Sequence, residues 1–282
     1  MTPAPAAPVG ISAERVALVN GLPQTTVSVH DRGLQYGDGL FETLRCEQGR
    51  VRWFDRHLAR LAAGCARLGL PAPDGAVLLH EVQSLLADCP RALVRLVLTR
   101  GVAKARGYRP TGDELATRIL TRHPWPASAG HEFRLGLSAV PLACNPLLAG
   151  LKHLNRLEQV LAQRGAASAG VDEVLMCARN GDVVSGSMSN LFLVQGGMLL
   201  TPPLLECGVA GVMRSLVLEL APQLGFEVCV TPLSVAQLAA APALFMTNVR
   251  LGIQDVHWYE GRRLQIDARS PRLQELIDHA ER

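Results

Sequence analysis

The placement of proline, glycine and apolar residues divides this sequence into two blocks of mixed strand and helix patterns. Residues 123–132, HPWPASAGHE, hold two prolines and several small residues between two strand patterns, which is typical of a linker. We therefore predict an α+β fold with an N-terminal α+β domain over residues 1–122 and a C-terminal α/β domain over residues 133–282, with a cleft between them. Residues 1–14 are expected to be disordered.

Strand and helix patterns alternate within both blocks. Short alternating or apolar runs predict strands at residues 15–20, 25–30, 39–46, 92–100, 115–122, 133–140, 172–178, 182–194, 198–202, 226–232 and 243–249. Apolar residues at helical spacing predict helices at 53–68, 75–88, from Lys152 onward, at 211–225, at 234–239 and from Ser270 onward. Asn180-Gly181 predicts a hairpin turn.

The composition excludes several classes of protein. With 48% hydrophobic and 19% charged residues, the chain has the composition of a globular protein. A net charge of +3 and 4% aromatic residues argue against nucleic-acid binding. No apolar run approaches the roughly 20 residues that span a membrane, and the first residues lack the pattern of a signal peptide, so we expect a cytoplasmic protein without membrane partners. The seven cysteines are widely spaced, without C-x-x-C pairs or metal-ligand spacing, so no metal site is expected.

One lysine occupies an unusual position. The 28 basic residues include only two lysines, Lys104 and Lys152, and Lys152 follows the small apolar run Leu-Ala-Gly-Leu. We predict that Lys152 opens a helix anchored by an apolar stripe at Leu154, Leu157, Val160 and Leu161. Burial and a helix N-terminus both lower the pKa of a lysine, as Schiff-base chemistry requires. The alternative is an ordinary surface lysine.

Three other stretches are candidates for binding an anion. In GVAGVMRS, two glycines flank the start of a predicted helix, so that backbone N–H groups there can face an anion. Thr247-Asn248 ends an apolar strand, and Arg45 ends the strand GLFETLR, where a guanidinium needs a partner. By itself, GVAGVMRS is more typical of a tight turn into a helix, and an ordinary turn is also the alternative at Thr247-Asn248. No Walker lysine, G-x-S-x-G nucleophile elbow or H-E-x-x-H motif is present.

Several motifs in order along the chain resemble a known family. DRGLQYGDGLFETLR, TRG followed by ARGY, NPLLAGLKHLNRLEQVLA and SNLFLV resemble the aminodeoxychorismate lyases of the fold-type IV pyridoxal-phosphate family, which also contains branched-chain and D-amino-acid aminotransferases. The resemblance runs from Arg15 onward, and LKHLNRLEQV favours the lyases over the aminotransferases. It implies the two-domain fold-type IV architecture with pyridoxal 5'-phosphate in the interdomain cleft, and a homodimer whose subunits help to build each other's sites.

The resemblance also implies roles for individual residues. Lys152 would carry the cofactor and act as the catalytic base, and Arg45, the backbone of Gly211, Val212 and Met213, and the Thr247-Asn248 pair would bind the cofactor phosphate. Arg106 and Tyr108 would lie near the carboxylates of the substrate, with a solvated loop as the alternative. The implied reaction removes a ring proton of 4-amino-4-deoxychorismate, expels pyruvate and leaves p-aminobenzoate for folate biosynthesis.

One position departs from the family pattern. The family places a glutamate that pairs with the pyridine nitrogen five residues before the asparagine of the NLF motif, and this chain has Ser185 there. A serine supplies no negative charge, so the cofactor would be a weaker electron sink. We expect the elimination to tolerate this change, because it is driven by aromatisation. The alternatives are a D-amino-acid or branched-chain aminotransferase, and a cofactor-binding paralogue with weak catalysis.

Overall fold

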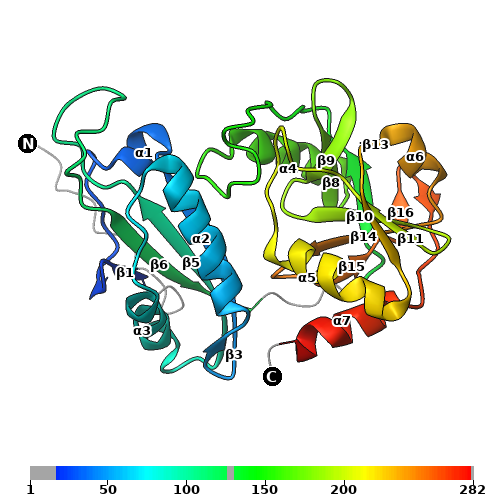
Figure 1. Cartoon of the computed structure of the whole chain (residues 1–282), viewed down its shortest axis with the longest axis horizontal. Coiled ribbons are helices and arrows are strands. Elements are labelled where there is room, and N and C mark those ends of the chain that lie inside the picture. The colour runs from blue at the N-terminus through cyan, green and yellow to red at the C-terminus, as the bar shows by residue number, and fades with distance from the viewer. Residues whose placement is uncertain (1–16, 126–129, 281–282) are drawn as a thin grey trace, which may run out of the picture.

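The structure, a computed structural model, describes residues 17–125 and 130–280. Figure 1 shows two halves side by side, the first built from residues up to 123 and the second from residues 134 onward. The strands of each half form separate sheets. The prediction of a disordered segment at 1–14 and part of the predicted linker, residues 126–129, lie outside the described residues, and we keep the division into two domains as a proposal.

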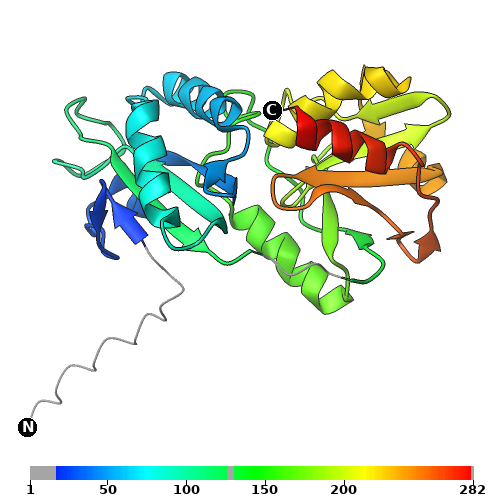
Figure 2. The same cartoon turned by 90° about the horizontal axis from the view of Figure 1, so that it is seen from below.

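The first half is an antiparallel sheet with helices on one face. Its strand order is β2-β1-β6-β5-β3-β4. The strands are β1 (Ala17–Val19), β2 (Leu22–Pro23), β3 (Gly39–Glu47), β4 (Arg50–Val51), β5 (Arg91–Thr99) and β6 (Thr117–His123). The helices are α1 (Arg32–Tyr36), α2 (Phe54–Leu68) and α3 (Gly75–Leu86). Figure 2 shows α2 and α3 over the same side of the sheet, where leucines of both layers form the core.

The second half packs two sheets together. One has the order β12-β11-β10-β14-β15 and the other β13-β9-β8-β7-β16-β17. Their strands are β7 (Arg134–Leu137), β8 (Glu173–Cys177), β9 (Asp182–Gly186), β10 (Asn190–Gln195), β11 (Met198–Thr201), β12 (Glu227–Val230), β13 (Leu233–Ser234), β14 (Ala243–Asn248), β15 (Gly252–Asp255), β16 (Trp258–Tyr259) and β17 (Arg262–Arg263). The helical elements are α4 (Leu157–Ala169), α5 (Val212–Leu220), the 3-10 helix Ala221–Leu224, α6 (Val235–Ala240) and α7 (Ser270–His279).

Helices α5 and α7 lie together over the five-stranded sheet (Figure 2). The core beneath them includes Phe192 and Phe245, whose rings stack 5.0 Å apart. It also includes Trp53, which is contributed by the first half and is almost fully buried. The two halves therefore share part of one hydrophobic core, which fixes how they meet.

Local sequence signals explain most helix boundaries. The side chain of Asp74 accepts hydrogen bonds from the backbone N–H groups of Ala76 and Val77 and so caps α3. Ser234 and Gln237 form a capping box at α6. Helix α2 ends at Gly69, which adopts a left-handed conformation with φ of 62°. The predicted helices at 53–68, 75–88, 234–239 and from Ser270 are confirmed to within two residues.

Three predictions about individual elements are wrong. Residues 25–30 form no strand, because their side chains are exposed and no neighbouring strand pairs with them in the described chain. The helix expected from Lys152 begins at Leu157, and Leu157, Val160 and Leu161 face solvent, while Ala162 and Ala166 are buried. Residues 182–194 form two strands in different sheets, joined by a turn at residues 187–189.

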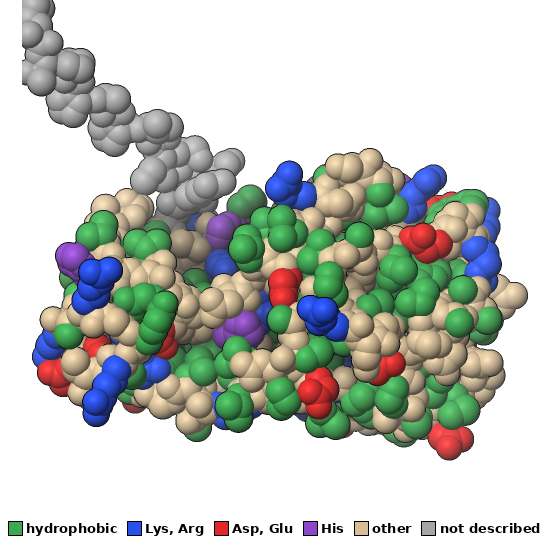
Figure 3. Space-filling view, turned by 90° about the horizontal axis from the view of Figure 1, so that it is seen from above, with side chains coloured by type: hydrophobic (Ala, Val, Ile, Leu, Met, Phe, Trp, Pro, Cys, Tyr) green, Lys and Arg blue, Asp and Glu red, His purple; other side chains and the backbone are tan. Residues whose placement is uncertain are grey.

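No helix in residues 17–125 and 130–280 is both long and apolar enough to cross a lipid bilayer. On the face shown in Figure 3, acidic and basic side chains are interspersed.

Candidate active site between the two halves

Lys152 lies in an extended segment that is paired with strand β3. The carbonyl oxygen of Lys152 accepts a hydrogen bond from the Phe41 N–H at 2.9 Å, and the Leu154 N–H donates to the Gly39 carbonyl at 3.1 Å. The Lys152 Nζ lies 4.2 Å from the centre of the Phe41 ring. Backbone pairing, rather than the predicted helix, therefore positions the lysine.

The surroundings of Lys152 favour its neutral form. Burial and the positive charge of Arg60 lower the pKa of Lys152 to about 7, and the carboxylate of Glu42 partly opposes this shift. Arg156 and Arg95 add smaller effects in the same direction as Arg60. The low pKa was expected from the sequence, but its expected cause, a helix N-terminus, is absent at this position.

Arg156 holds the peptide groups on both sides of Lys152. Its Nη2 donates to the Leu151 carbonyl and its Nε to the His153 carbonyl, both at 2.9 Å. Burial lowers the pKa of Arg156 to about 10, so it stays charged at neutral pH. Arg156 thus fixes the backbone of the lysine and repels its protonated form, two effects that the position of Arg156 in the sequence did not reveal.

A buried ionic network lies behind the lysine. The Glu42 carboxylate accepts hydrogen bonds from the Arg60 guanidinium, with its Nε at 2.8 Å, and contacts the His57 Nδ1 at 2.8 Å. Burial alone would raise the pKa of Glu42, but the charge of Arg60 and the hydrogen bonds of both partners lower it to about 2. Arg60 also donates to the Ala210 carbonyl at 3.0 Å, which links α2 to the start of α5.

The N-terminus of α5 is open to an anion. Gly211 precedes the helix and offers no side-chain cap, so the first N–H groups of α5, including those of Val212 and Met213, have no partner within the helix. Asn190 donates to the Val209 carbonyl at 3.0 Å, and a Cβ on Gly211 would lie only 2.2 Å from its Oδ1. The glycine therefore permits close packing against Asn190. An uncapped helix end beside Arg60 suits a phosphate group.

The predicted lip at Thr247-Asn248 adjoins this helix end through Asn190, which pairs with Thr247 across β10 and β14. Thr247 is buried, and its hydroxyl donates to the Gly252 carbonyl at 2.7 Å. The Asn248 side-chain oxygen accepts hydrogen bonds from the N–H groups of Arg250 and Leu251. Both side chains thus close the hairpin between β14 and β15, while the pair lies at the rim of the α5 end.

Arg45 lies apart from these groups. It shares one face of β3 with Phe41 but donates to the Glu47 carboxylate at 3.1 Å and stacks on the Trp125 ring at 4.9 Å. None of the described contacts joins it to Lys152 or α5. Arg60 occupies the position next to α5 that was expected of Arg45. The sequence signal for Arg60 was indirect, since Glu42 in an apolar strand requires a cationic partner.

Ser185 is buried on β9, and its hydroxyl donates to the Gly186 carbonyl at 2.8 Å. A nearby carboxylate, that of Glu173, accepts hydrogen bonds from the hydroxyls of Ser187 and Ser189 at 2.5 and 2.9 Å. Glu173 thereby shapes the turn between β9 and β10 and brings Asn190 to the α5 end. The serines of SGSMSN therefore organise this turn.

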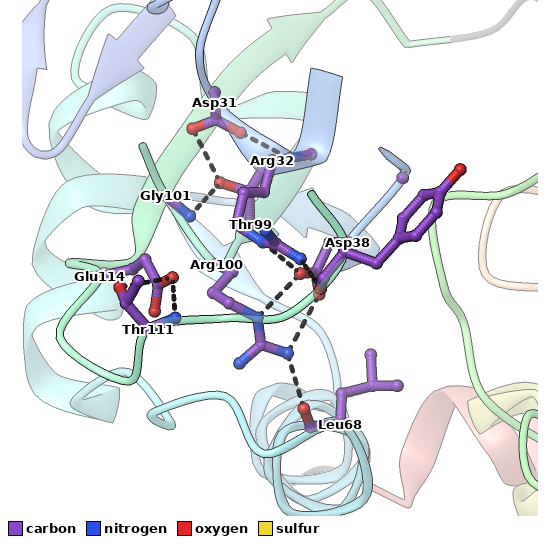
Figure 4. A network of polar contacts seen from close by, with 12 residues as sticks. Asp31, Arg32, Asp38, Leu68, Thr99, Arg100, Gly101, Thr111 and Glu114 are labelled. Carbon is purple, nitrogen blue, oxygen red and sulfur yellow. Dashed lines mark hydrogen bonds and ion pairs between the residues drawn. The ribbon is translucent and has the colours of Figure 1, made fainter. Parts of the chain in front are cut away.

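The loop that carries Arg106 and Tyr108 is held by its backbone. The Arg32 guanidinium donates to the carbonyls of Gly107 and Tyr108 at 3.1 and 2.6 Å. Asp38 binds both Arg32 and Arg100 (Figure 4). Burial alone would raise the pKa of Asp38, but the hydrogen bonds from these two arginines lower it. The side chains of Arg106 and Tyr108 are exposed, and no described contact joins them to Lys152 within one chain.

The chain is similar to known proteins over most of its length. The family model for amino-transferase class IV matches residues 39–259. The chain is 35% identical to an aminodeoxychorismate lyase of Vibrio harveyi, over 88% of this chain and 93% of that protein. It is 34% identical to a putative branched-chain-amino-acid aminotransferase of Methanocaldococcus jannaschii, over 84% and 83%. The crystal structure of 4-amino-4-deoxychorismate lyase from Pseudomonas aeruginosa superposes with a TM-score of 0.88 at 42% identity, covering 95% of this chain and all of that one.

The pKa of Lys152 can be measured without any ligand, because the chain has only two lysines. We expect the labelling rate of Lys152 in the cofactor-free protein, measured by peptide mass spectrometry after brief treatment with an acylating reagent, to rise with a midpoint near pH 7. The pKa of an ordinary lysine is about 10.4. The exposed Lys104, labelled in the same sample, is the internal reference for reagent quality. A labelling midpoint above pH 9 for Lys152 would contradict a lowered pKa at this residue.

Proposed function

The chain belongs to the class IV aminotransferase family, and we propose that within this family it is a pyridoxal-phosphate-dependent lyase that converts 4-amino-4-deoxychorismate into p-aminobenzoate and pyruvate. Lys152 is the observation that carries the proposal: a half-buried amine with a pKa of about 7, placed between β3 and an uncapped helix end. The likeness of most of the chain to two lyases supports the substrate.

The residues around Lys152 suit pyridoxal 5'-phosphate. The first N–H groups of α5, at Val212 and Met213, together with Arg60 would bind the phosphate, and Gly211 leaves room beside Asn190. Thr247 and Asn248 would border it. Lys152 would hold the aldehyde carbon, because its amine is neutral near pH 7. We keep Arg45 as the second candidate for the phosphate, since the resemblance implies it.

The chemistry divides between cofactor and protein. Pyridoxal phosphate, when bound, supplies an electron sink for the carbanion that forms when the substrate ring loses a proton. The neutral Nζ of Lys152 accepts that proton, and the nearby positive charges of Arg60 and Arg156 keep the resulting ammonium acidic enough to release it again. Loss of the enolpyruvyl group then leaves an aromatic ring, and the enol becomes pyruvate.

Ser185 bears on which reaction is favoured. Its hydroxyl supplies no counter-charge for a protonated pyridine nitrogen, and the Glu173 carboxylate is bound by the two serine hydroxyls of the turn. Amino-group transfer depends on the cofactor as an electron sink in both half-reactions. Elimination depends on it less, because formation of an aromatic product also drives the reaction. The position therefore favours the lyase. The branched-chain or D-amino-acid aminotransferase remains the second candidate, supported by the 34% identity to a putative aminotransferase.

We further propose a homodimer. Leu157, Val160 and Leu161 form an exposed apolar stripe on α4, which a partner subunit would cover. Arg32 binds the backbone of the loop with Arg106 and Tyr108, and no described contact joins these two side chains to Lys152, as expected if the loop reaches the site of the partner. Both features support the shared sites that the resemblance implies.

The lyase proposal predicts p-aminobenzoate release from enzymatically generated 4-amino-4-deoxychorismate, dependent on added pyridoxal phosphate. Lys152→Ala should lower the rate at least about a thousandfold, because it removes both cofactor attachment and base, whereas Lys104→Ala should not change it. Chromatographic detection of p-aminobenzoate and a coupled assay for pyruvate should agree in stoichiometry. A protein that binds cofactor but releases only amino-transfer products from D-alanine or leucine would instead be an aminotransferase.

The two candidate arginines can be separated by cofactor affinity. We expect Arg60→Met to weaken binding of pyridoxal phosphate by roughly tenfold or more, since it removes a charged hydrogen-bond donor from the phosphate. Arg45→Met is the matched control and should leave affinity within about twofold. Fluorescence titration of the cofactor-free proteins measures both, and unfolding temperatures check that Arg60→Met still folds. The reverse order of effects would assign the phosphate to Arg45.

Shared sites predict complementation between two inactive variants. Co-expressed Lys152→Ala and Arg106→Ala chains, purified through two different tags so that only mixed dimers remain, should recover about half of the wild-type activity, because one of the two sites in each mixed dimer regains both residues. Each variant alone should have little activity. If the mixed dimers are as inactive as the parents, the loop serves its own subunit.

A further inference from the structure

Two cysteines that the proposed reaction does not use lie beside the site. The Sγ atoms of Cys144 and Cys207 are 3.7 Å apart, although the residues are 63 positions apart in sequence. Cys144 is exposed and Cys207 is buried. A disulfide has a sulfur–sulfur distance of about 2.05 Å, so a small movement of the side chains would bring the two atoms into bonding distance.

The backbone around the two thiols is already fixed. The Asn145 N–H donates to the Glu206 carbonyl at 2.8 Å, which ties together the residues that follow Cys144 and precede Cys207. Further along, the Gly150 N–H donates to the Gly208 carbonyl and the Ala210 N–H to the Gly150 carbonyl, both at 3.0 Å. The two segments therefore run side by side from the cysteines to the active site.

These segments carry the two main parts of the site. The first continues from Cys144 to Lys152, and the second from Cys207 to the start of α5 at Gly211. Hydrogen bonds and a hydrophobic cluster that includes Leu142 and Cys207 join them at the cysteine end. A covalent bond there would restrict the lysine segment from moving away from the helix end, and would do so reversibly.

We propose that Cys144 and Cys207 form a reversible disulfide by exchange with a low-molecular-weight disulfide such as glutathione disulfide. The Cys144 thiolate attacks one sulfur of glutathione disulfide, which forms a mixed disulfide and releases one glutathione thiolate. Cys207 then loses its proton and attacks the Cys144 sulfur, releasing the second glutathione. Two protein thiols are oxidised and one small disulfide is reduced to two thiols, so the exchange balances without another oxidant.

The order of the two steps follows from the surroundings of the thiols. Cys144 is open to solvent and receives the small disulfide first. Burial and the neighbouring thiol of Cys144 raise the pKa of Cys207 to about 12, so the Cys207 thiol does not react on its own. Once Cys144 is in a mixed disulfide, its thiol no longer contributes to that shift, and the buried sulfur lies beside the bond it must attack.

The test uses the full chain incubated with glutathione disulfide, quenched with N-ethylmaleimide and analysed by intact and peptide mass spectrometry. Wild type should gain a Cys144–Cys207 linkage without retained glutathione. Cys207→Ser should instead retain one glutathione on Cys144, and Cys144→Ser should form no linkage to Cys207. Cys89→Ser, a control at another partly exposed cysteine, should behave as wild type.

The linkage should also stabilise the protein. Because it closes a loop of more than 60 residues, oxidised wild type should unfold at a temperature roughly 5 °C above that of the reduced protein, and Cys144→Ser should show no such difference. Dithiothreitol should reverse the shift. Stable glutathione on Cys144 of wild type, or a linkage that leaves Cys207 free, would overturn the proposal.

Discussion

Two backbone hydrogen bonds between β3 and the segment of Lys152 are the contacts on which the site depends. They attach a segment of the second half to the beginning of β3, next to last in the sheet of the first half, and place the Lys152 amine over the Phe41 ring. Arg60 makes the corresponding link from α2 to the residue before α5. With Trp53 buried in the core of the second half, these contacts make the space between the halves a defined site.

The charged residues around Lys152 favour the neutral form of its amine. A buried lysine next to two arginines loses its proton easily, and the neutral amine removes the cost of burying three like charges together. Glu42 compensates the charge of Arg60, with its own pKa lowered to about 2, and opposes the shift of the Lys152 pKa only in part. The Glu42 carboxylate therefore positions Arg60 for binding an anion, while the pKa of Lys152 stays lowered.

The turn between β9 and β10 lies between Ser185 and Asn190, the residue that packs against Gly211 at the start of α5. Glu173 binds Ser187 and Ser189, and this turn sets Asn190 against Gly211. Ser185 lies just before it, at the position that we propose to border the cofactor ring. A chain that keeps the framework but has an uncharged residue here is suited to an elimination in which the product itself supplies driving force.

The sequence by itself determined the fold class and the capped helices, because capping residues, glycines and apolar periodicity act over a few neighbouring positions. It also marked Lys152 and the α5 end as candidates for the site. It could not place Arg156, because its partners, the Leu151 and His153 carbonyls, are backbone groups that no side chain marks in the sequence. For Arg60 the sequence offered only the indirect signal of Glu42, and the fold brings the two together. Nor could it show that α4 begins at Leu157 or that Arg45 turns to Glu47. Strand pairing across the two halves decided these points, because a segment bonded to β3 cannot also form the first turn of a helix.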